Sequence, residues 1–228
     1  MNRPLALIPA YEAAERVGSV VEEALAHLPV LVVDDGSTDD TAAVAAAAGA
    51  EVLSQPRNLG KGEALRRGFV EALGRGALAV VTLDADGQHD PAEIPAFLDA
   101  WRATGADLVV GARDFRAMPP SRRLANTLGR IVLRWATGRD LADNQSGYRL
   151  HSRRLVDVAR ERAEEPGFGF EVEVIVACVE RGWRVEWIPI RTIYGDQGSH
   201  IHPVAHVARF LRLAARIRRA SGRRRRAR

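Results

Sequence analysis

Cysteine is almost absent from this chain, because its 228 residues include only one, Cys178. A single thiol cannot form a disulfide within the chain, so the fold must depend on its hydrophobic core. Cys178 follows the apolar run at residues 174–177. This setting favours a buried structural thiol over a catalytic nucleophile.

Long apolar runs are also missing, and no stretch approaches the ~20 apolar residues that a membrane-spanning helix needs. The first residues, MNRPLALIPAY, include one basic residue, and their apolar stretch is too short for a signal peptide. The segment leads directly into a predicted strand. We therefore expect the catalytic part to be soluble and cytoplasmic.

Acidic residues are missing after Asp196, whereas residues 209–228 contain ten arginines. The formal net charge of +4 therefore hides a body whose net charge is negative. A basic balance that comes from a tail gives no reason to expect nucleic acid as a partner of the whole domain.

The segment before this tail places apolar residues at helical spacing, with arginines on another face. This pattern predicts an amphipathic basic helix over residues 203–219, followed by an arginine-rich tail at 220–228. Such a helix suits the surface of an anionic membrane and would make the protein peripheral on the inner face of the cell membrane. The alternative is a helix that packs on the domain.

Short β-rich runs alternate with helical patterns in the first half of the chain. We predict strands at 5–8, 30–33, 51–53, 78–83 and 108–110, and helices at 16–28, 41–48, 61–73 and 94–104. This alternation predicts right-handed crossovers and a Rossmann-like α/β fold, with a mainly parallel sheet covered by helices on both faces.

The second half follows a different pattern, and no Pro/Ser-rich linker separates it from the first. We predict a basic helix at 121–137, a loop at 140–149, helices from Ser152 and from Glu171, and a last strand at 184–193. These elements are expected to cover a site on the sheet, so that residues 1–202 form one domain.

Polar loops follow three of the predicted strands, at residues 9–12, 34–37 and 84–88. In parallel sheets, ligands bind beyond the carboxyl ends of the strands, so these loops should meet at one edge.

Asp84 and Asp86 end a very apolar strand, where two carboxylates repel each other unless a cation relieves them. Hard oxygen ligands of this kind suit Mg²⁺ or Mn²⁺ together with a diphosphate, and Gln88 can add a neutral oxygen. The alternative is a solvated turn.

Two further segments have both a functional and a structural interpretation. In VVDDGSTDDT, Asp35 is the candidate to accept from a nucleotide base or ribose, although the segment also suits a cap for the helix near Thr41. In NLGKG, small residues and Lys61 at a helix start suit a phosphate, although the glycines could serve the turn alone.

Taken together, seven motifs carry a family resemblance. They are IPAYE, VVDDGSTD, NLGKGEALRRGF, TLDADGQHDPAEIP, DLVVGAR, DNQSGYRL and GFGFEVEV, between about residues 8 and 200. In this order they resemble the family 2 glycosyltransferases, and most of all the polyprenyl-phosphate (dolichyl-phosphate) mannosyltransferase branch. The resemblance implies a GT-A fold, a GDP- or UDP-sugar donor, transfer with inversion, and usually a lipid-phosphate acceptor.

The resemblance also implies roles for single residues. It places Pro9, Tyr11 and Glu12 around the nucleotide, with Asp35 on the base or ribose. Asp84, Asp86 and Gln88 would hold the metal and the donor diphosphate, with Asp84 nearer the nucleotide or supporting the ion, and 89–91 would form the turn into the next helix. A cation such as Lys61 or Arg113 would help to stabilise the departing diphosphate.

On the acceptor side, Arg113 resembles an arginine directed at phosphate. Arg122 or Arg123 could act similarly, and the alternative for an arginine on that helix is a solvated surface charge. Asp143 is the residue expected to face the acceptor and to act as a base toward a hydroxyl acceptor. Arg149 would be a structural strut or a phosphate ligand. Of Glu171 and Glu173, one could cap the start of the helix and the other could reach the site, and the sequence does not decide which.

This chain departs from the branch in two places. It has Ser199-His200 where a Ser-Lys pair is frequent, so a phosphate contact through His200 would be weaker or pH-dependent. It also has a basic amphipathic helix where some members have spanning helices.

The sequence thus predicts a metal-dependent, inverting hexosyltransferase that uses a nucleotide-sugar donor and a polyprenyl-phosphate acceptor. Two alternatives stay open. One is the same chemistry on a soluble small-molecule or glycan acceptor, and the other is a non-catalytic sugar-nucleotide-binding module. A nucleotidyltransferase would instead show a Gly- and Arg-rich phosphate loop where this chain has IPAYE.

Overall fold

The computed structural model describes residues 3–114, 120–163, 165, 167, 169–191 and 210–219, without the side chains of residues 120–122, 125 and 162. His200, residues 203–209 and the tail at 220–228 lie outside the described residues, as does the side chain of Arg122.

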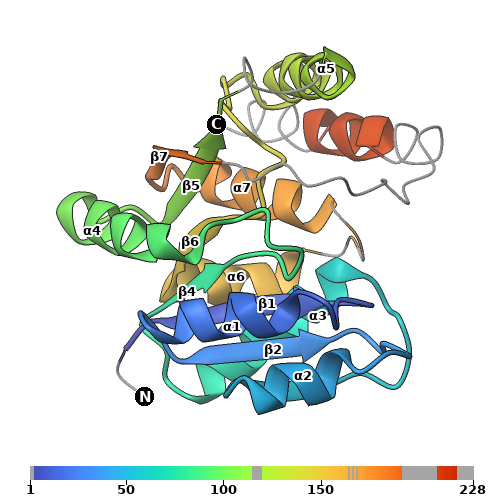
Figure 1. Cartoon of the computed structure of the whole chain (residues 1–228). Helices are drawn as coiled ribbons and strands as arrows, with labels where there is room; N and C mark the ends of the chain where they lie inside the picture. The colour runs from blue at the N-terminus through green and yellow to red at the C-terminus, as the bar shows by residue number, and fades with distance from the viewer. Residues whose placement is uncertain are drawn as a thin grey trace.

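A seven-stranded mixed sheet forms the centre of the molecule, in the order β3-β2-β1-β4-β6-β5-β7 (Figure 1). The strands are β1 (Leu5–Ala10), β2 (Val30–Asp34), β3 (Glu51–Ser54), β4 (Ala79–Thr82), β5 (Leu108–Arg113), β6 (Arg149–Ser152) and β7 (Val185–Ile190). Strands β1 to β4 run parallel, and β7 runs parallel to β5. The prediction of a mainly parallel sheet is confirmed.

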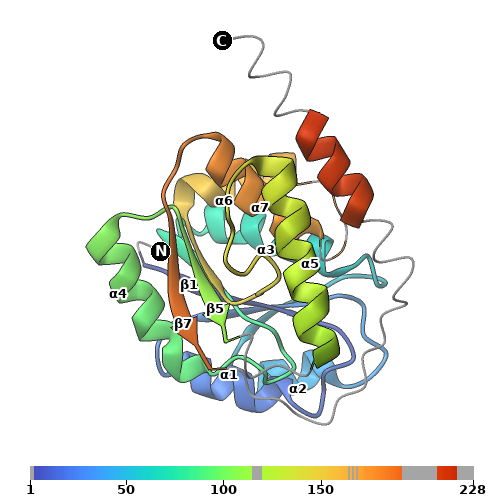
Figure 2. The ribbon, with the colours of Figure 1, turned by 90° about the horizontal axis from the view of Figure 1, so that it is seen from above.

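Helices cover both faces of this sheet, as Figures 1 and 2 show. They are α1 (Val17–Leu25), α2 (Thr41–Ala47), α3 (Lys61–Gly74), α4 (Ile94–Thr104), α5 (Pro120–Thr137), α6 (Arg153–Arg162) and α7 (Gly169–Glu180), with a short 3₁₀ turn, η1, at Pro91–Glu93. Asp90 caps that turn through the amide of Ala92, as expected for the entry into α4.

Strand β6 was not predicted, and it is the main correction to the fold. The sequence pattern predicts Arg149 in a loop and a helix that begins at Ser152. The structure instead places residues 149–152 in the middle of the sheet, antiparallel to both β4 and β5. A four-residue strand of sequence RLHS has neither the length nor the apolar run of a central strand, so its pattern gave no signal.

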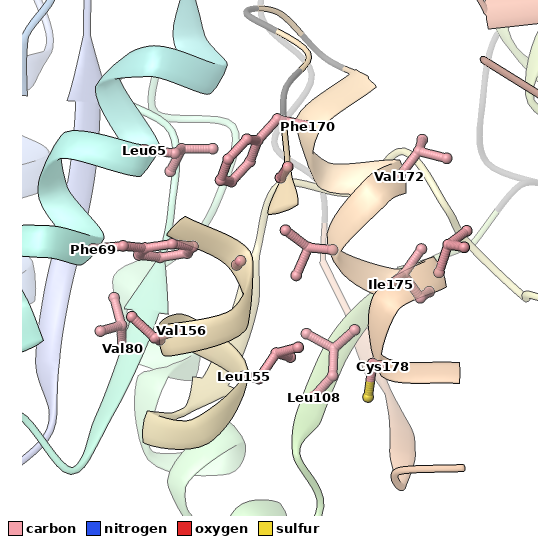
Figure 3. Close-up of a cluster of buried hydrophobic side chains, with 14 of the residues drawn as sticks. Leu65, Phe69, Val80, Leu108, Leu155, Val156, Phe170, Val172, Ile175 and Cys178 are labelled. Carbon is pink, nitrogen blue, oxygen red and sulfur yellow. The ribbon is translucent and has the colours of Figure 1, made fainter. Parts of the chain in front are cut away.

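Side chains that alternate along the strands build two cores. Leu5 and Leu7 belong to the core shared with α3, α6 and α7, whereas Ala6 and Ile8 belong to the core shared with α1, α2 and α4. The first of these cores also contains Cys178 (Figure 3). Its burial raises the pKa of the thiol to about 12, so the prediction of a buried structural cysteine is confirmed.

The described part of the basic helix, residues 210–219, packs on the domain. Leu213, Ala214 and Ile217 are buried in the same core as α7. Arg216 forms ion pairs with Glu165 and Glu173. Of the two interpretations of this helix, packing is therefore the observed one, and the face holding these three residues is used within the protein. No helix among the described residues has the length and apolar content needed to cross a bilayer.

Phe69 joins the two halves of the chain, because its buried ring lies 5.1 Å from the His151 ring and 5.9 Å from the Phe170 ring. We expect Phe69→Ala to lower the free energy of unfolding by about 3–5 kcal/mol, since it leaves a cavity between α3, β6 and α7. Val70→Ala on the same helix is the control, because Val70 is half exposed and its loss should cost less than ~0.5 kcal/mol. Equal urea midpoints for the two variants would contradict this assignment.

Candidate functional site

The polar loops after β1, β2 and β4 meet at one edge of the sheet, as predicted. The cause is the parallel register, in which Ala10 pairs with Asp34 and Leu7 pairs with Thr82. The loops enclose a cavity of about 690 Å³, which is in the size range of small-molecule sites. Its lining includes these predicted nucleotide-site residues: Pro9, Tyr11, Glu12, Asp35, Lys61, Asp84 and Asp86.

Glu12 ties the first of these loops to the second. Its carboxylate Oε1 accepts from the amide of Thr38 at 2.7 Å and from its hydroxyl at 3.0 Å, and its own amide donates to Ser37 Oγ. Glu12 also has a φ of 49°, a left-handed conformation that is uncommon for residues other than glycine. The loop is thus held in one shape, and the contact of Pro9, Tyr11 and Glu12 with a nucleotide remains a prediction.

Asp35 is buried, and its carboxylate organises the loop that leads into α3. Oδ1 accepts from Gln55 Nε2 and from the Leu59 amide, and Oδ2 accepts from the Gly60 amide, each at 2.8 Å. Burial raises the pKa of Asp35. The predicted contact with a base or ribose is untested, but the residue has a second task that the sequence did not indicate.

Lys61, the first residue of α3, connects two carboxylates. Its Nζ lies 2.6 Å from Asp84 Oδ1 and 3.0 Å from Glu171 Oε1. Burial by itself lowers the pKa of this amine, but the charges of Asp84 and Glu171 outweigh burial and raise the pKa above its ordinary value. Lys61 is therefore a fixed positive charge at the edge of the cavity.

Asp84 and Asp86 both line the cavity and differ in their surroundings. Burial raises the pKa of Asp86, and the negative charge of Asp84 raises it further. For Asp84, burial is the largest single effect and acts in the same direction, but the charge and hydrogen bond of Lys61, together with further positive charge nearby, lower the pKa overall. The amide of Asp84 donates to Nδ1 of the buried His89, and burial lowers the pKa of that imidazole, which favours its neutral form.

This donor set fits a divalent cation shared with a diphosphate. Among the described residues, no group of three or more His, Cys, Asp or Glu side chains could hold a metal by itself. Two carboxylates on one strand end, completed by substrate phosphates and water, are the usual protein contribution to a Mg²⁺ site. The backbone amide of Gln88 donates to Asp86 Oδ1 at 2.9 Å, and the role of the Gln88 side chain as a metal ligand stays a prediction.

The antiparallel direction of β6 brings a further loop to this edge. Thr82 pairs with Arg149, so the residues before β6 lie beside the residues after β4. Thr82 Oγ1 donates to the Gly147 carbonyl at 2.8 Å. A Cβ atom on Gly147 would lie 2.9 Å from Asp84 Oδ2, 2.9 Å from Lys61 Nζ and 3.0 Å from Glu171 Oε1. Glycine therefore allows the backbone to lie directly against the ionic cluster.

Asp143, in the same loop, faces Arg113 at the end of β5. Arg113 donates through Nε to Oδ2 at 2.7 Å and through Nη2 to Oδ1 at 2.9 Å, and the carboxylate is almost fully buried. Burial alone would raise the pKa of Asp143, but the bonds from Arg113 outweigh it and lower the pKa. In the structure this carboxylate forms an ion pair that fixes Arg113, and the predicted contact of Asp143 with an acceptor is untested.

Arg149 requires a correction. Its side chain is completely buried, and its guanidinium donates to three backbone carbonyls: Ser146 at 2.7 Å, Glu171 at 2.5 Å and Asn144 at 3.0 Å. A phosphate ligand needs donors that face the cavity, and these donors are used within the protein. The strut interpretation is therefore the observed one.

The structure ranks the two glutamates that the sequence left unranked. Glu171 is buried and contacts Lys61 in the cluster. Glu173 accepts from the Glu165 amide and pairs with Arg216 of the basic helix, away from Lys61.

Three residues that shape this region had no role at the site in the sequence-based prediction: Gln55, His89, which was placed only in a turn, and Gly147. Gln55 and His89 support Asp35 and Asp84, and only the fold reveals these contacts. Gly147 belongs to a motif noted in the sequence, but the requirement for glycine at this position follows only from the pairing of β6 with β4.

Arg149→Lys should lower the free energy of unfolding by about 2–4 kcal/mol, because lysine cannot reach three carbonyls in this fork geometry and leaves buried acceptors unpaired. The matched control is Arg160→Lys, at a surface arginine that pairs with Asp157 and Glu161. Urea unfolding of the two variants measures the difference. A loss no larger than that of the control would remove the strut assignment.

Comparisons with known proteins identify the family to which the chain is similar. The family model for glycosyl transferase family 2 matches residues 6–157. The undecaprenyl-phosphate mannosyltransferase of Micrococcus luteus is 32% identical over 213 residues, which cover 86% of each chain. The polyprenol monophosphomannose synthase of Mycolicibacterium smegmatis is 32% identical over 83% of this chain and 77% of the relative.

Among solved structures, glucosyl-3-phosphoglycerate synthase from Mycobacterium tuberculosis, in complex with phosphoglyceric acid, superposes with a TM-score of 0.74 at 22% identity. The match covers 96% of this chain and 80% of the synthase. The same enzyme in complex with Mn²⁺, UDP and glucosyl-3-phosphoglycerate gives a TM-score of 0.72 at 20% identity, over 95% of this chain and 78% of the synthase. The predicted GT-A fold is confirmed, and the chain belongs to glycosyl transferase family 2.

Proposed function

We propose that this glycosyltransferase moves a hexose from a nucleotide-diphosphate sugar to a polyprenyl phosphate, with inversion at the anomeric carbon and with the help of Mg²⁺ or Mn²⁺. One observation carries the proposal: Asp84, Asp86 and Lys61 line one cavity at the sheet edge. The relatives named above, which act on undecaprenyl and polyprenol phosphates, support the choice of acceptor.

The donor side of the proposal rests on the residues around the cavity. Asp86 and Asp84 would hold the metal, which would stabilise the charge that develops on the departing diphosphate. Lys61 would supply a second positive charge at the same place, since its Nζ is already held beside Asp84. The synthase crystallised with Mn²⁺ and UDP supports a divalent ion and a nucleoside diphosphate. The base and the sugar of the donor are left to experiment.

With a phosphate acceptor, Asp143 does not have to act as a general base, so its ion pair with Arg113 is compatible with the proposed reaction. A phosphate monoester has a second pKa near ~6, so it is already largely dianionic at neutral pH and needs no strong general base. Asp143 then serves as a positioning residue that holds Arg113 at the carboxyl end of β5. Arg113 and Arg123 remain candidates for the acceptor phosphate, and the proposed contributions of Arg122 and His200 fall outside the described side chains.

The proposal is tested by incubating the full chain with Mg²⁺ or Mn²⁺ and a panel of GDP- and UDP-hexoses, each with polyprenyl phosphate, with a soluble sugar acceptor, or with no acceptor. We expect a glycosyl-phosphate lipid from one donor. Asp86→Ala should lower the rate at least ~10²-fold, because it removes a proposed metal ligand, whereas Asp99→Ala on the exposed face of α4 should not. Transfer to the soluble acceptor alone would overturn the choice of acceptor. Full activity of Asp86→Ala would overturn the metal assignment.

Gly147→Ala tests whether the ionic cluster takes part in transfer. Its new methyl group would meet Asp84, Lys61 and Glu171 at about 3 Å or less, so we expect these charged groups to be displaced and the rate to fall at least ~10-fold. Gly74→Ala is the matched control, because nothing lies within 4 Å of its Cβ position at the end of α3. Unfolding midpoints separate a folding defect from a defect at the site. Unchanged transfer by Gly147→Ala would exclude the cluster from the reaction.

A further inference from the structure

Helix α5 leaves large apolar side chains in water. Leu124, Leu128, Ile131 and Trp135 are 61%, 53%, 58% and 55% exposed, and their spacing places them in one stripe along the helix. Single exposed apolar residues are ordinary, but a contiguous row of this size marks an interaction surface. We name these four residues the α5 stripe.

The opposite face of α5 is buried against the domain. It presents Asn126, Gly129, Leu133 and Ala136, of which Leu133 and Ala136 belong to the core shared with α7. The face of α5 that packs into the core is therefore a different one from the stripe. The stripe is a second apolar face that points away from the protein.

Positive charge lies along the edge of this stripe. Arg123, Arg130 and Arg134 each stand one residue before a member of the stripe, so they form a parallel row turned by about 100° around the helix. No acidic residue occurs between Pro120 and Thr137. Asp140 pairs with Arg130, and Arg123 and Arg134 are exposed.

The basic helix at 210–219 extends the same surface. It lies beside α5 in both views (Figures 1 and 2). Arg218 donates to the Trp135 carbonyl at 3.1 Å, and its guanidinium lies 5.5 Å from the centre of the Trp135 ring. This helix contains four arginines and no acidic residue, and Leu211 is about half exposed.

We propose that the α5 stripe and the arginines beside it dock the protein on an anionic lipid bilayer. The apolar side chains would enter the boundary between headgroups and acyl chains, and Trp135 suits that boundary because its ring is apolar and its N–H polar. The arginines would meet lipid phosphates at the anionic surface. A second copy of the chain fits less well, because it would bring two arginine-rich surfaces together.

The docking face also has a direct physical connection to the candidate site. The inner face of α5 covers the loop at 143–147, since a Cβ on Gly129 would lie 3.0 Å from Gln145 Nε2. The same loop places Gly147 against the Lys61 cluster. One helix would thus have its outer face on the bilayer and its inner face on the loop at the site. This goes beyond the proposed function, because a lipid acceptor alone does not say which face meets the membrane.

Vesicle co-sedimentation of the full chain tests the proposal. The probes are vesicles of phosphatidylcholine alone and of equal parts phosphatidylcholine and phosphatidylglycerol. We expect binding to the mixed vesicles that weakens in high salt. The double variant Leu128→Ser/Ile131→Ser should bind at least about 10-fold more weakly. The control is Val70→Ser/Leu78→Ser, which removes two side chains of 50% and 42% exposure elsewhere and should bind like the original chain.

A second measurement places the contact on α5 itself. Brominated acyl chains should quench tryptophan fluorescence on binding, and Trp135→Phe should remove most of that quenching while Trp101→Phe should not. Equal binding by the two double variants, or no quenching, would overturn the proposal. A dimer that the α5 double variant abolishes, without vesicle binding, would assign the stripe to a second copy instead. Transfer to a detergent-solubilised polyprenyl phosphate should persist in the α5 variant, so its failure in every variant would count against the proposed function only.

Discussion

The candidate site depends on the pair of salt bridges that the Lys61 ammonium group forms, because they join carboxylates from two distant parts of the chain. Asp84 follows β4 in the first half, and Glu171 lies in the first turn of α7 in the second. A buried charge is costly unless it is paired, and here one cation serves two carboxylates that would otherwise repel each other. The bridge therefore holds the second half against the sheet edge and still leaves a negative environment around Asp86, where a divalent cation is favoured.

Much of this arrangement follows from local sequence. Strands β1 to β5 and their loops were predictable because apolar runs end at polar residues, and parallel pairing then brings those ends together. Strand β6 was not, since Arg149 and His151 are buried polar residues in a short central strand, and their contacts with the Glu171 carbonyl and the Phe69 ring join distant parts of the chain. The sequence also could not show which of Glu171 and Glu173 contacts Lys61. Helix α7 is apolar on nearly all sides, so its pattern does not indicate which face meets Lys61.

Charged residues in the DNQSGYR segment show that residue type alone does not assign a role. Asp143 and Arg149 both suggest contact with substrate, yet each is buried and bound within the protein. The partners of Asp143 lower its pKa, so it stays ionised and is a poor proton acceptor at neutral pH. The three carbonyls bound by Arg149 come from the loop itself and from the start of α7, so this arginine fixes the loop that carries Gly147. Their common effect is to hold backbone next to the cluster.

The two amphipathic helices, α5 and the helix at 210–219, differ in whether their apolar faces are buried. Sequence periodicity indicates that a helix has an apolar face, but it does not say whether that face is buried. The helix at 210–219 turns Leu213 and Ile217 inward, whereas α5 turns its stripe outward. On the inner face of α5, Gly129 packs within contact distance of the loop at 143–147, and Leu133 is buried in the core. These inner residues already cover the domain, and leaving the four large apolar side chains of the outer face in water is unfavourable unless another apolar phase covers them.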